Sequence, residues 1–141
     1  MKFIDGKTRC NWIKDHLLYL QYHDEEWGVP IYDDHKLLEL LVLESAEAGL
    51  SWLTILKKRA NYRLAYDNFD PEKVACYDST KEEQLLMNAG IIRSKAKIIS
   101  SVQNARKFLE IQKQHGSFSN YIWNYVDHQP ILNNWNTSEE V

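Results

Sequence analysis

LLELLVLESAEAGLSW, residues 37–52, is the clearest helical pattern in the chain. At about 100° per residue its apolar positions recur with the period of an α-helix. One face of that helix carries Leu37, Leu40, Leu41, Glu44 and Ala48. Glu44 lies at the centre of a face that is otherwise typical of a protein core. Burying an unpaired carboxylate costs on the order of several kcal/mol, so we expect a neighbouring donor or a ligand to satisfy Glu44.

Caps and turns before and after this stretch predict further helices. Asp33 or Asp34 can cap the first helix, which is expected to run to about Ala48 and to stop at Gly49. Ser51 can cap a second helix that continues through Tyr66. Asp70 followed by Pro71 is typical of a cap and a first helical residue, and predicts a short helix to about Cys76.

The second half of the chain shows the same helical pattern. Ser79 with Glu82, or Thr80 with Glu83, forms a capping box for a helix that ends at Asn88-Ala89-Gly90. A longer helix is expected over residues 94–112 and a short one over residues 118–125. No strand pairs or internal repeats are evident. The fold class is therefore predicted to be all-α, with a single helical domain over residues 1–141.

Composition narrows the class of protein. The chain has 141 residues, 44% of them hydrophobic and 12% aromatic, which is typical of one globular domain. No apolar run approaches the roughly 18 residues of a membrane span, and no signal peptide is evident. With two cysteines only, we expect a cytoplasmic protein. We also expect a monomer that does not associate with membranes. The polar tail after Pro130 leads us to expect a domain that is incomplete at its C-terminus.

Charge is unevenly distributed along the chain. Residues 23–47 hold eight acidic side chains and one lysine, whereas residues 89–108 hold five basic side chains and no acidic one. Within residues 85–104, Gly90 permits a positive φ in a tight turn, and the next helix opens beside Arg93, Lys95 and Lys97. This segment resembles a helix-hairpin-helix element, which binds DNA phosphates without reading sequence. The alternative is an ordinary helical hairpin that ends with a glycine cap.

Aromatic residues surround Glu44 in sequence. They are Trp12, Tyr19, Tyr22, Trp27 and Trp52. Aromatic rings stack on bases and attract cations to their faces. Any one of these rings could belong to an ordinary core, but five of them around a misplaced carboxylate favour a pocket.

Cys10 and His23 are candidate metal ligands. Two ligands make a weak signal, because a structural zinc site normally needs four. The remaining Cys76, His115 and His128 are isolated in sequence.

Several long strings of the sequence are similar to one known family. They are Arg9-Cys10-Asn11-Trp12, the segment YHDEEWGVP at residues 22–30, LESAEAGLSWLTILKKRANYR at residues 43–63, NAGIIRSKAKI at residues 88–98 and WNYVDHQP at residues 123–130. With these strings the chain resembles the constitutive bacterial family of DNA-3-methyladenine glycosylases I. The similarity extends from about Arg9 to Pro130.

The resemblance implies a fold, an activity and a set of roles. The fold is that of the helix-hairpin-helix glycosylases, and the substrate is alkylated duplex DNA. The reaction hydrolyses the N-glycosidic bond of N3-methyladenine, releases the free base and leaves an abasic site without lyase chemistry. Glu44 and Tyr22 match the catalytic positions, with Trp52, Trp12, Trp27 and Tyr19 around the base. Gly90, Arg93, Lys95 and Lys97 correspond to the DNA-binding hairpin, and Cys10 and His23 to two of four ligands of a structural zinc.

Two departures from the family leave alternatives open. Its other two zinc ligands lie in a C-terminal segment that has no counterpart here, and relatives often carry Gly and Gln where this chain has Ser45, Ala46 and Glu47. Glu47 either changes base preference or faces solvent, and Asp127 is a weak candidate for assisting the reaction. The alternative functions are a non-enzymatic helix-hairpin-helix DNA-binding module and a protein-interaction domain.

Overall fold

Helices make up the regular structure of the computed structural model, which describes residues 5–13, 16–135 and 137. No strand occurs in these ranges. The α-helices are α1 (Leu17–Glu25), α2 (Asp34–Glu47), α3 (Trp52–Ala65), α4 (Pro71–Ala75), α5 (Ser79–Met87), α6 (Lys95–His115) and α7 (Phe118–Trp123). Short 3₁₀ helices are η1 (Asn11–Ile13), η2 (Asp67–Phe69) and η3 (Asn124–Val126). The prediction of an all-α fold is confirmed.

Three predicted helix starts are confirmed by their capping hydrogen bonds. The side chains of Asp33, Ser51 and Asp70 accept hydrogen bonds from the first backbone N–H groups of α2, α3 and α4. Each bond satisfies a donor that has no partner within its helix. Gly49 follows α2 with a φ of 78°, the left-handed conformation that ends many helices.

Other boundaries differ from the sequence prediction. Helix α5 is capped by Asp78 and not by Ser79 or Thr80, because the Asp78 carboxylate accepts from the N–H of Lys81. Helix α6 runs three residues further than expected, to His115. Helix α1 was not predicted. None of its residues is fully buried, so its sequence lacks the contrast between apolar and polar faces that marks an amphipathic helix.

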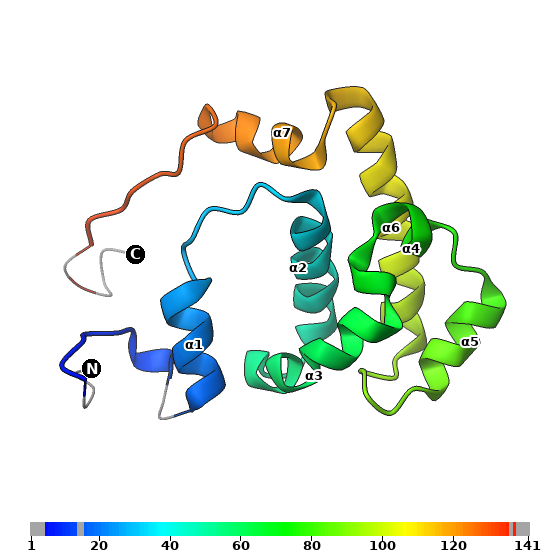
Figure 1. Cartoon of the computed structure of the whole chain (residues 1–141), viewed down its shortest axis with the longest axis horizontal. Helices are drawn as coiled ribbons and strands as arrows, with labels where there is room; N and C mark the ends of the chain where they lie inside the picture. Colours follow the sequence, from blue (N-terminus) through cyan, green and yellow to red (C-terminus); the bar gives the residue numbers. More distant parts are fainter. Residues whose placement is uncertain (1–4, 14–15, 136, 138–141) are drawn as a thin grey trace.

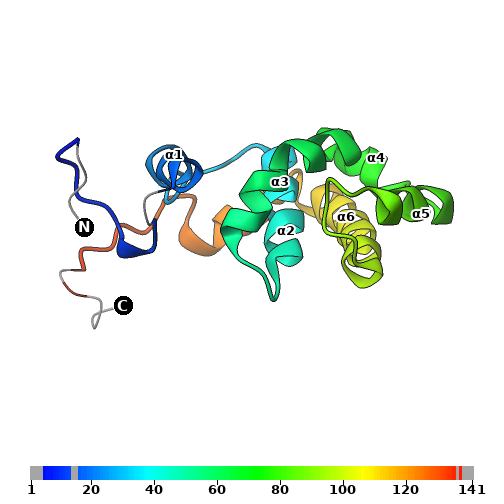
Figure 2. The same cartoon turned by 90° about the horizontal axis from the view of Figure 1, so that it is seen from below.

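The helices are arranged around α2 and α6. Helix α6 packs against α2, α4, α5 and α7, while α3 packs against α2 and α1 (Figure 1). The first and last described stretches of the chain lie at the same end of the molecule, on the side of α1 and away from α4 and α5 (Figure 2). Over the described ranges, no helix combines the length and the apolar character needed to cross a bilayer.

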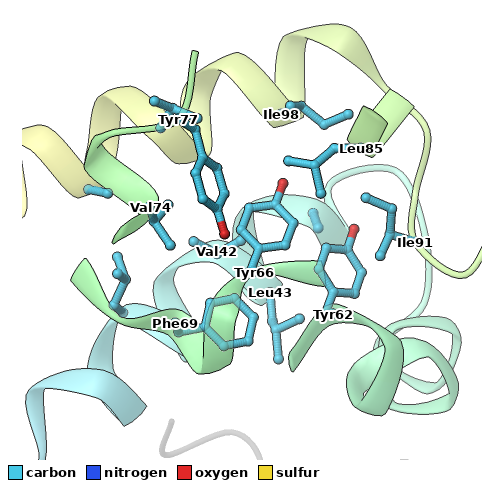
Figure 3. Packing of buried hydrophobic residues seen from close by; sticks show 14 of the residues in the cluster. Val42, Leu43, Tyr62, Tyr66, Phe69, Val74, Tyr77, Leu85, Ile91 and Ile98 are labelled. Atoms are coloured by element: carbon cyan, nitrogen blue, oxygen red, sulfur yellow. The ribbon is translucent and has the colours of Figure 1, made fainter. Parts of the chain in front are cut away.

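Stacked aromatic rings form the centre of the core. Tyr66 is almost fully buried and stacks on Tyr62 and Phe69, with ring centroids 5.7 and 5.6 Å apart (Figure 3). Its hydroxyl is satisfied by Ser101, and burial raises the pKa of Tyr66 to about 12. The ring of Tyr77 packs against the same group, with its centroid 6.0 Å from that of Tyr66. The hydroxyl groups of Tyr62, Tyr66 and Tyr77 all have hydrogen-bond partners, which helps to hold these rings in fixed orientations.

Helix α2 has its core face on the opposite side from the predicted one. Its fully buried apolar residues are Leu38, Val42, Leu43 and Ala46, while Leu37, Leu40 and Leu41 are half-buried and Ala48 is exposed. At about 100° per residue, Glu44 points roughly away from that buried face. The prediction that Glu44 lies at the centre of the core face is therefore wrong. Helix α2 is apolar on nearly all sides, so periodicity alone could not identify the face that is fully covered.

The buried carboxylate of α2 is Glu39. It is 6% exposed and accepts hydrogen bonds from Arg59 and Arg63 of α3, and Arg59 also donates to Glu26 at a distance of 2.7 Å. Paired and hydrogen-bonded in this way, the charge tolerates burial. Arg59 thus ties α3 to both α2 and the residue that follows α1.

A second carboxylate of α2 fixes a distant helix. Asp34 accepts hydrogen bonds from the backbone N–H groups of Phe118 and Ser119, and from the side chain of Gln112. The negative charge therefore lies at the positive N-terminus of α7. Residues more than 80 positions apart are joined by this contact, which holds α7 across the start of α2.

Replacing Glu39 by glutamine tests the buried ion pair. The substitution keeps the size of the side chain and removes the charge between two guanidinium groups. We expect the free energy of unfolding to fall by about 2–4 kcal/mol in urea denaturation, because Arg59 then lacks its buried counter-charge. Glu83→Gln, at an exposed position of α5, should change it by about 0.5 kcal/mol or less. Equal losses in the two variants would contradict the role given to Glu39.

Candidate functional site

A hollow of about 350 Å³ lies between α1, α2 and α3. Its lining consists of Trp12, Tyr19, Tyr22, Trp27, Glu44, Glu47 and Trp52. The structure thus brings together every residue that the sequence suggested for the base pocket, together with Glu47. A cavity of this size, mostly aromatic and with few polar groups, is typical of a site for a small planar ligand.

Edge-to-face contacts hold the aromatic rings of the hollow. Trp12 lies between Tyr19 and Trp27, with ring centroids 5.5 Å from each and interplanar angles of 83° and 74°. Tyr22 meets Trp52 at 5.4 Å and 61°. These arrangements suit the ring quadrupoles and do not stack the rings on one another. The rings therefore form a fixed aromatic wall.

Helix α1 is the element that assembles this wall. Tyr19 and Tyr22 lie three residues apart in α1, so both point to one side of it. The hydroxyl of Tyr19 accepts a hydrogen bond from the backbone N–H of Leu53 at 3.1 Å, which fixes α1 to the first turn of α3. Trp52, one residue earlier, is thereby held against Tyr22.

One buried donor in the wall has no protein acceptor. Among the described residues, the indole N–H of Trp52 is the buried side-chain polar atom without a hydrogen-bond partner. Such groups are rare, because leaving a donor unsatisfied costs about 1–3 kcal/mol. Trp52 lines the hollow, but this nitrogen is closed to solvent, so the unsatisfied donor is a cost of packing and marks no ligand position.

The electrostatics of the hollow are dominated by carboxylates. Partial burial against the aromatic wall raises the pKa of Glu44, and the neighbouring charge of Glu47 raises it further. Glu44 remains accessible to solvent, so the effect is that of a carboxylate at the edge of the hollow and not of one sealed in a core. Burial also raises the pKa of Tyr22, and the negative charges of Glu44 and Glu26 raise it further. Tyr22 therefore keeps its proton and can donate a hydrogen bond at neutral pH.

Sequence reasoning missed the residues that support the pocket. Arg59 bridges Glu39 and Glu26 and so holds α1, which carries Tyr19 and Tyr22, against α2 and α3. The sequence offered no specific signal for this bridge, because its members lie 20 and 33 residues apart. A buried glutamate facing two arginines one turn apart becomes recognisable only when the helices are packed.

The predicted hairpin is formed by α5, α6 and the turn between them. Gly90 does not have the positive φ that we predicted, since the glycines with positive φ are Gly6, Gly28, Gly49 and Gly116. Glycine is needed at this position for space. A Cβ there would lie 2.9 Å from Cγ of Asn61 in α3. Gly90 thus lets the turn pack closely against the side chain of Asn61 in α3.

The basic residues of the hairpin fall into two groups. Arg93 and Lys95 are exposed at the start of α6, where the N-terminal N–H groups favour anions. Lys97 is half-buried, and its ammonium group donates to the carbonyl oxygens of Ala46 and Ala48 at 2.8 and 2.7 Å. It therefore caps the C-terminal end of α2 beside the hollow, a role that sequence reasoning did not foresee.

Cys10 and His23 do not by themselves form a metal centre. Cys10 is exposed, and Nδ1 of His23 lies 3.0 Å from the carboxylate of Asp24, which Arg9 also binds. No group of three or more His, Cys, Asp or Glu suited to a metal ion occurs in the part of the chain that the structure describes. These residues supply at most two of the four ligands that a structural zinc requires. Asp127 is exposed beyond η3 and does not line the hollow.

Fold and site together define a class of protein. A basic helical hairpin lies next to a hollow with aromatic walls and a carboxylate, within one all-α domain. This combination defines a DNA glycosylase of the helix-hairpin-helix class, in which one element holds the backbone and another receives a base. The chain belongs to the methyladenine glycosylase family, whose model matches residues 12–141.

Individual relatives agree with the family assignment. The chain is 44% identical to the DNA-3-methyladenine glycosylase of Haemophilus influenzae over 126 residues, which are 89% of this chain and 68% of that protein. It is also 44% identical to DNA-3-methyladenine glycosylase 1 of Escherichia coli over 133 residues, 94% of this chain and 71% of that protein. A solved structure of a variant 3-methyladenine DNA glycosylase I in complex with 3-methyladenine superposes with a TM-score of 0.89 at 38% identity, covering 94% of this chain and 71% of that one.

Replacing Gly90 by alanine tests the close approach of the hairpin to α3. The added methyl group would collide with Asn61, and we expect a loss of about 1–3 kcal/mol in the free energy of unfolding. In an Asn61→Gly background the same substitution should cost about 0.5 kcal/mol or less, because the colliding atoms are gone. If Gly90→Ala costs the same in both backgrounds, conformational freedom and not space explains the glycine.

Proposed function

We propose that the chain is a DNA-3-methyladenine glycosylase that excises N3-methylated adenine from duplex DNA in base excision repair. As an N-glycosyl hydrolase it breaks the bond between base and sugar, releases 3-methyladenine and leaves an abasic site. The observation that carries this proposal is the hollow in which Glu44 lies beside three edge-to-face aromatic contacts. Family membership and the relatives named above support it.

The chemistry of the substrate explains the lining of the hollow. Methylation at N3 gives the adenine of the nucleotide a positive charge, which weakens the glycosidic bond and supplies a handle for recognition. The damaged base must leave the duplex to be reached, at a cost of a few kcal/mol. Aromatic walls offset this cost by about 1–3 kcal/mol for a stacked base, and their faces attract cations. Unmodified adenine lacks the charge and is a poorer leaving group.

Glu44 is proposed as the group that recognises the base. Its carboxylate can accept a hydrogen bond from the exocyclic amino group and favours the positive charge of the ring. The Tyr22 hydroxyl, whose pKa is raised, stays protonated and can donate to a ring nitrogen. Interactions with the charged ring hold the base while the bond to the sugar breaks. No lysine lines the hollow in the described part of the chain, in accord with attack by water and without a covalent intermediate.

The hairpin is proposed to bind a backbone phosphate of the DNA. Exposed Arg93 and Lys95 add charge to the N-terminus of α6, and such contacts position the duplex without reading its sequence. The hollow and the hairpin belong to one chain, which supports a monomer as the active form. Two free, exposed cysteines support a cytoplasmic location. The structural zinc stays a prediction, supported only by Cys10 and His23.

Release of bases from alkylated DNA tests the proposed activity. The wild-type protein, incubated with methylated duplex DNA, should liberate 3-methyladenine that chromatography identifies. Glu44→Gln should lower the rate about 10- to 100-fold, because a charge-assisted hydrogen bond is lost. In the wild type the rate should also fall on acidification. Because the pKa of Glu44 is raised, its carboxylate takes up a proton at a higher pH than an ordinary glutamate does. Glu83→Gln should behave as wild type. DNA binding without any released base would favour the non-enzymatic binding module.

Charge reversal in the hairpin tests the DNA-binding surface separately. Arg93→Glu with Lys95→Glu should weaken binding of undamaged duplexes about equally for different sequences. The dependence of affinity on salt should become shallower, because fewer counterions are released. Quenching of tryptophan fluorescence by free 3-methyladenine should not change, since neither residue lines the hollow. Unchanged DNA affinity would remove this surface from the DNA footprint.

A further inference from the structure

A second carboxylate shares the hollow with Glu44. Glu47 lies three residues further along α2, so the two side chains leave the helix on neighbouring positions, and both line the hollow. The rest of the lining is aromatic. Among the residues that the structure describes, no lysine or arginine lies within salt-bridge distance of either carboxylate, although several carboxylates elsewhere are paired. The described lining of the hollow therefore holds two carboxylates and no cationic side chain.

The position of Glu47 is unfavourable for a free carboxylate. It is the last residue of α2, where the helix dipole is negative. It faces Glu44 across one helical turn, and like charges at that spacing repel. Burial, and after it this repulsion, raises the pKa of Glu44. The ammonium group of Lys97 donates to the carbonyl oxygens of Ala46 and Ala48, the residues on either side of Glu47, and forms no salt bridge with the Glu47 carboxylate. A carboxylate kept under such conditions lowers the stability of the empty protein and suits a site that receives a cation.

We propose that Glu47 is a specificity-determining residue that makes the hollow select positively charged purine bases over neutral ones. The inference rests on the proposed function and deepens it. A methylated base in DNA carries a fixed positive charge, whereas the released 3-methyladenine loses its charge near neutral pH. A second carboxylate in the hollow attracts the cationic base of the substrate and does not attract the neutral product. Glu47 thus strengthens binding of the substrate base without increasing retention of the product, as differential binding requires.

Two purine ligands separate the effect of charge from that of shape. The first is 3,9-dimethyladeninium, a permanent cation in which a methyl group replaces the sugar. The second is 3-methyladenine at a mildly alkaline pH, where it is uncharged. Glu47→Gln keeps the size of the side chain and should weaken binding of the cation, followed by tryptophan fluorescence, by about three- to tenfold. Binding of the neutral ligand should change by about twofold or less. Glu47→Asp should keep most of the preference for the cation.

The stability of the ligand-free protein supplies a second readout, which Glu47→Gln should increase while it weakens binding of the cation. Without ligand, Glu47→Gln should raise the urea midpoint, because repulsion from Glu44 and from the end of the helix is removed. Glu83→Gln, which removes a charge from an exposed position of α5, should alter neither the midpoint nor the ratio of the two affinities. We therefore expect Glu47→Gln to give a more stable protein that discriminates less between the cationic and the neutral ligand.

The outcomes that overturn the proposal differ from those that overturn the function. Equal weakening of both ligands by Glu47→Gln would mean that Glu47 shapes the hollow and does not select charge. An unchanged ratio with unchanged affinities would mean that it faces solvent. Failure of the wild-type protein to release 3-methyladenine from methylated DNA would instead overturn the proposed function, and this assay is run before the variants are compared.

Discussion

Arg59 lies between two carboxylates, and three helices depend on that contact. Through Glu39 it binds α3 to α2, and through Glu26 it binds α3 to the end of α1. Helix α1 has no fully buried residue, so half-buried side chains and this polar contact together hold it in place. The same helix carries two rings of the hollow. A guanidinium group is suited to this task, because its fixed fork of donors can satisfy separate carboxylates at defined angles. The aromatic wall is consequently supported by electrostatics as much as by packing.

Local interactions explain which parts of the fold could be predicted from sequence. The caps Asp33, Ser51 and Asp70 act within three residues of themselves, and the helices that they start were predicted correctly. Helix α1 was missed because its stability comes from Tyr19 bonding to Leu53 and from Arg59, which are contacts between distant segments. The prediction of a positive φ at Gly90 was wrong. Glycine is needed there because the side chain of Asn61, on another helix, leaves no room for a Cβ atom.

The candidate pocket shows a similar division. In the sequence, Glu44 lies close to several aromatic residues, and the structure brings those residues together around one hollow. The argument from periodicity placed Glu44 on the wrong face, because the side of α2 opposite the core also carries apolar residues, the half-buried Leu37, Leu40 and Leu41. Glu39, which is the buried carboxylate of that helix, gave no signal until Arg59 and Arg63 were placed opposite it. Sequence therefore indicated which residues gather in the site more reliably than which of them are buried.

Lys97 links the hairpin to the wall of the hollow. It belongs to the first turn of α6, beside the residues proposed to hold a phosphate, and its ammonium group is fastened to the end of α2, beside Glu47. Lys97 thus fixes the distance between the hollow and the start of α6, where a phosphate is proposed to bind. Under the proposed function, a strand whose extruded base enters the hollow must present a phosphate at that distance. The proposal then implies that damage in DNA too stiff to bend to this distance is repaired poorly, even where its base fits the pocket.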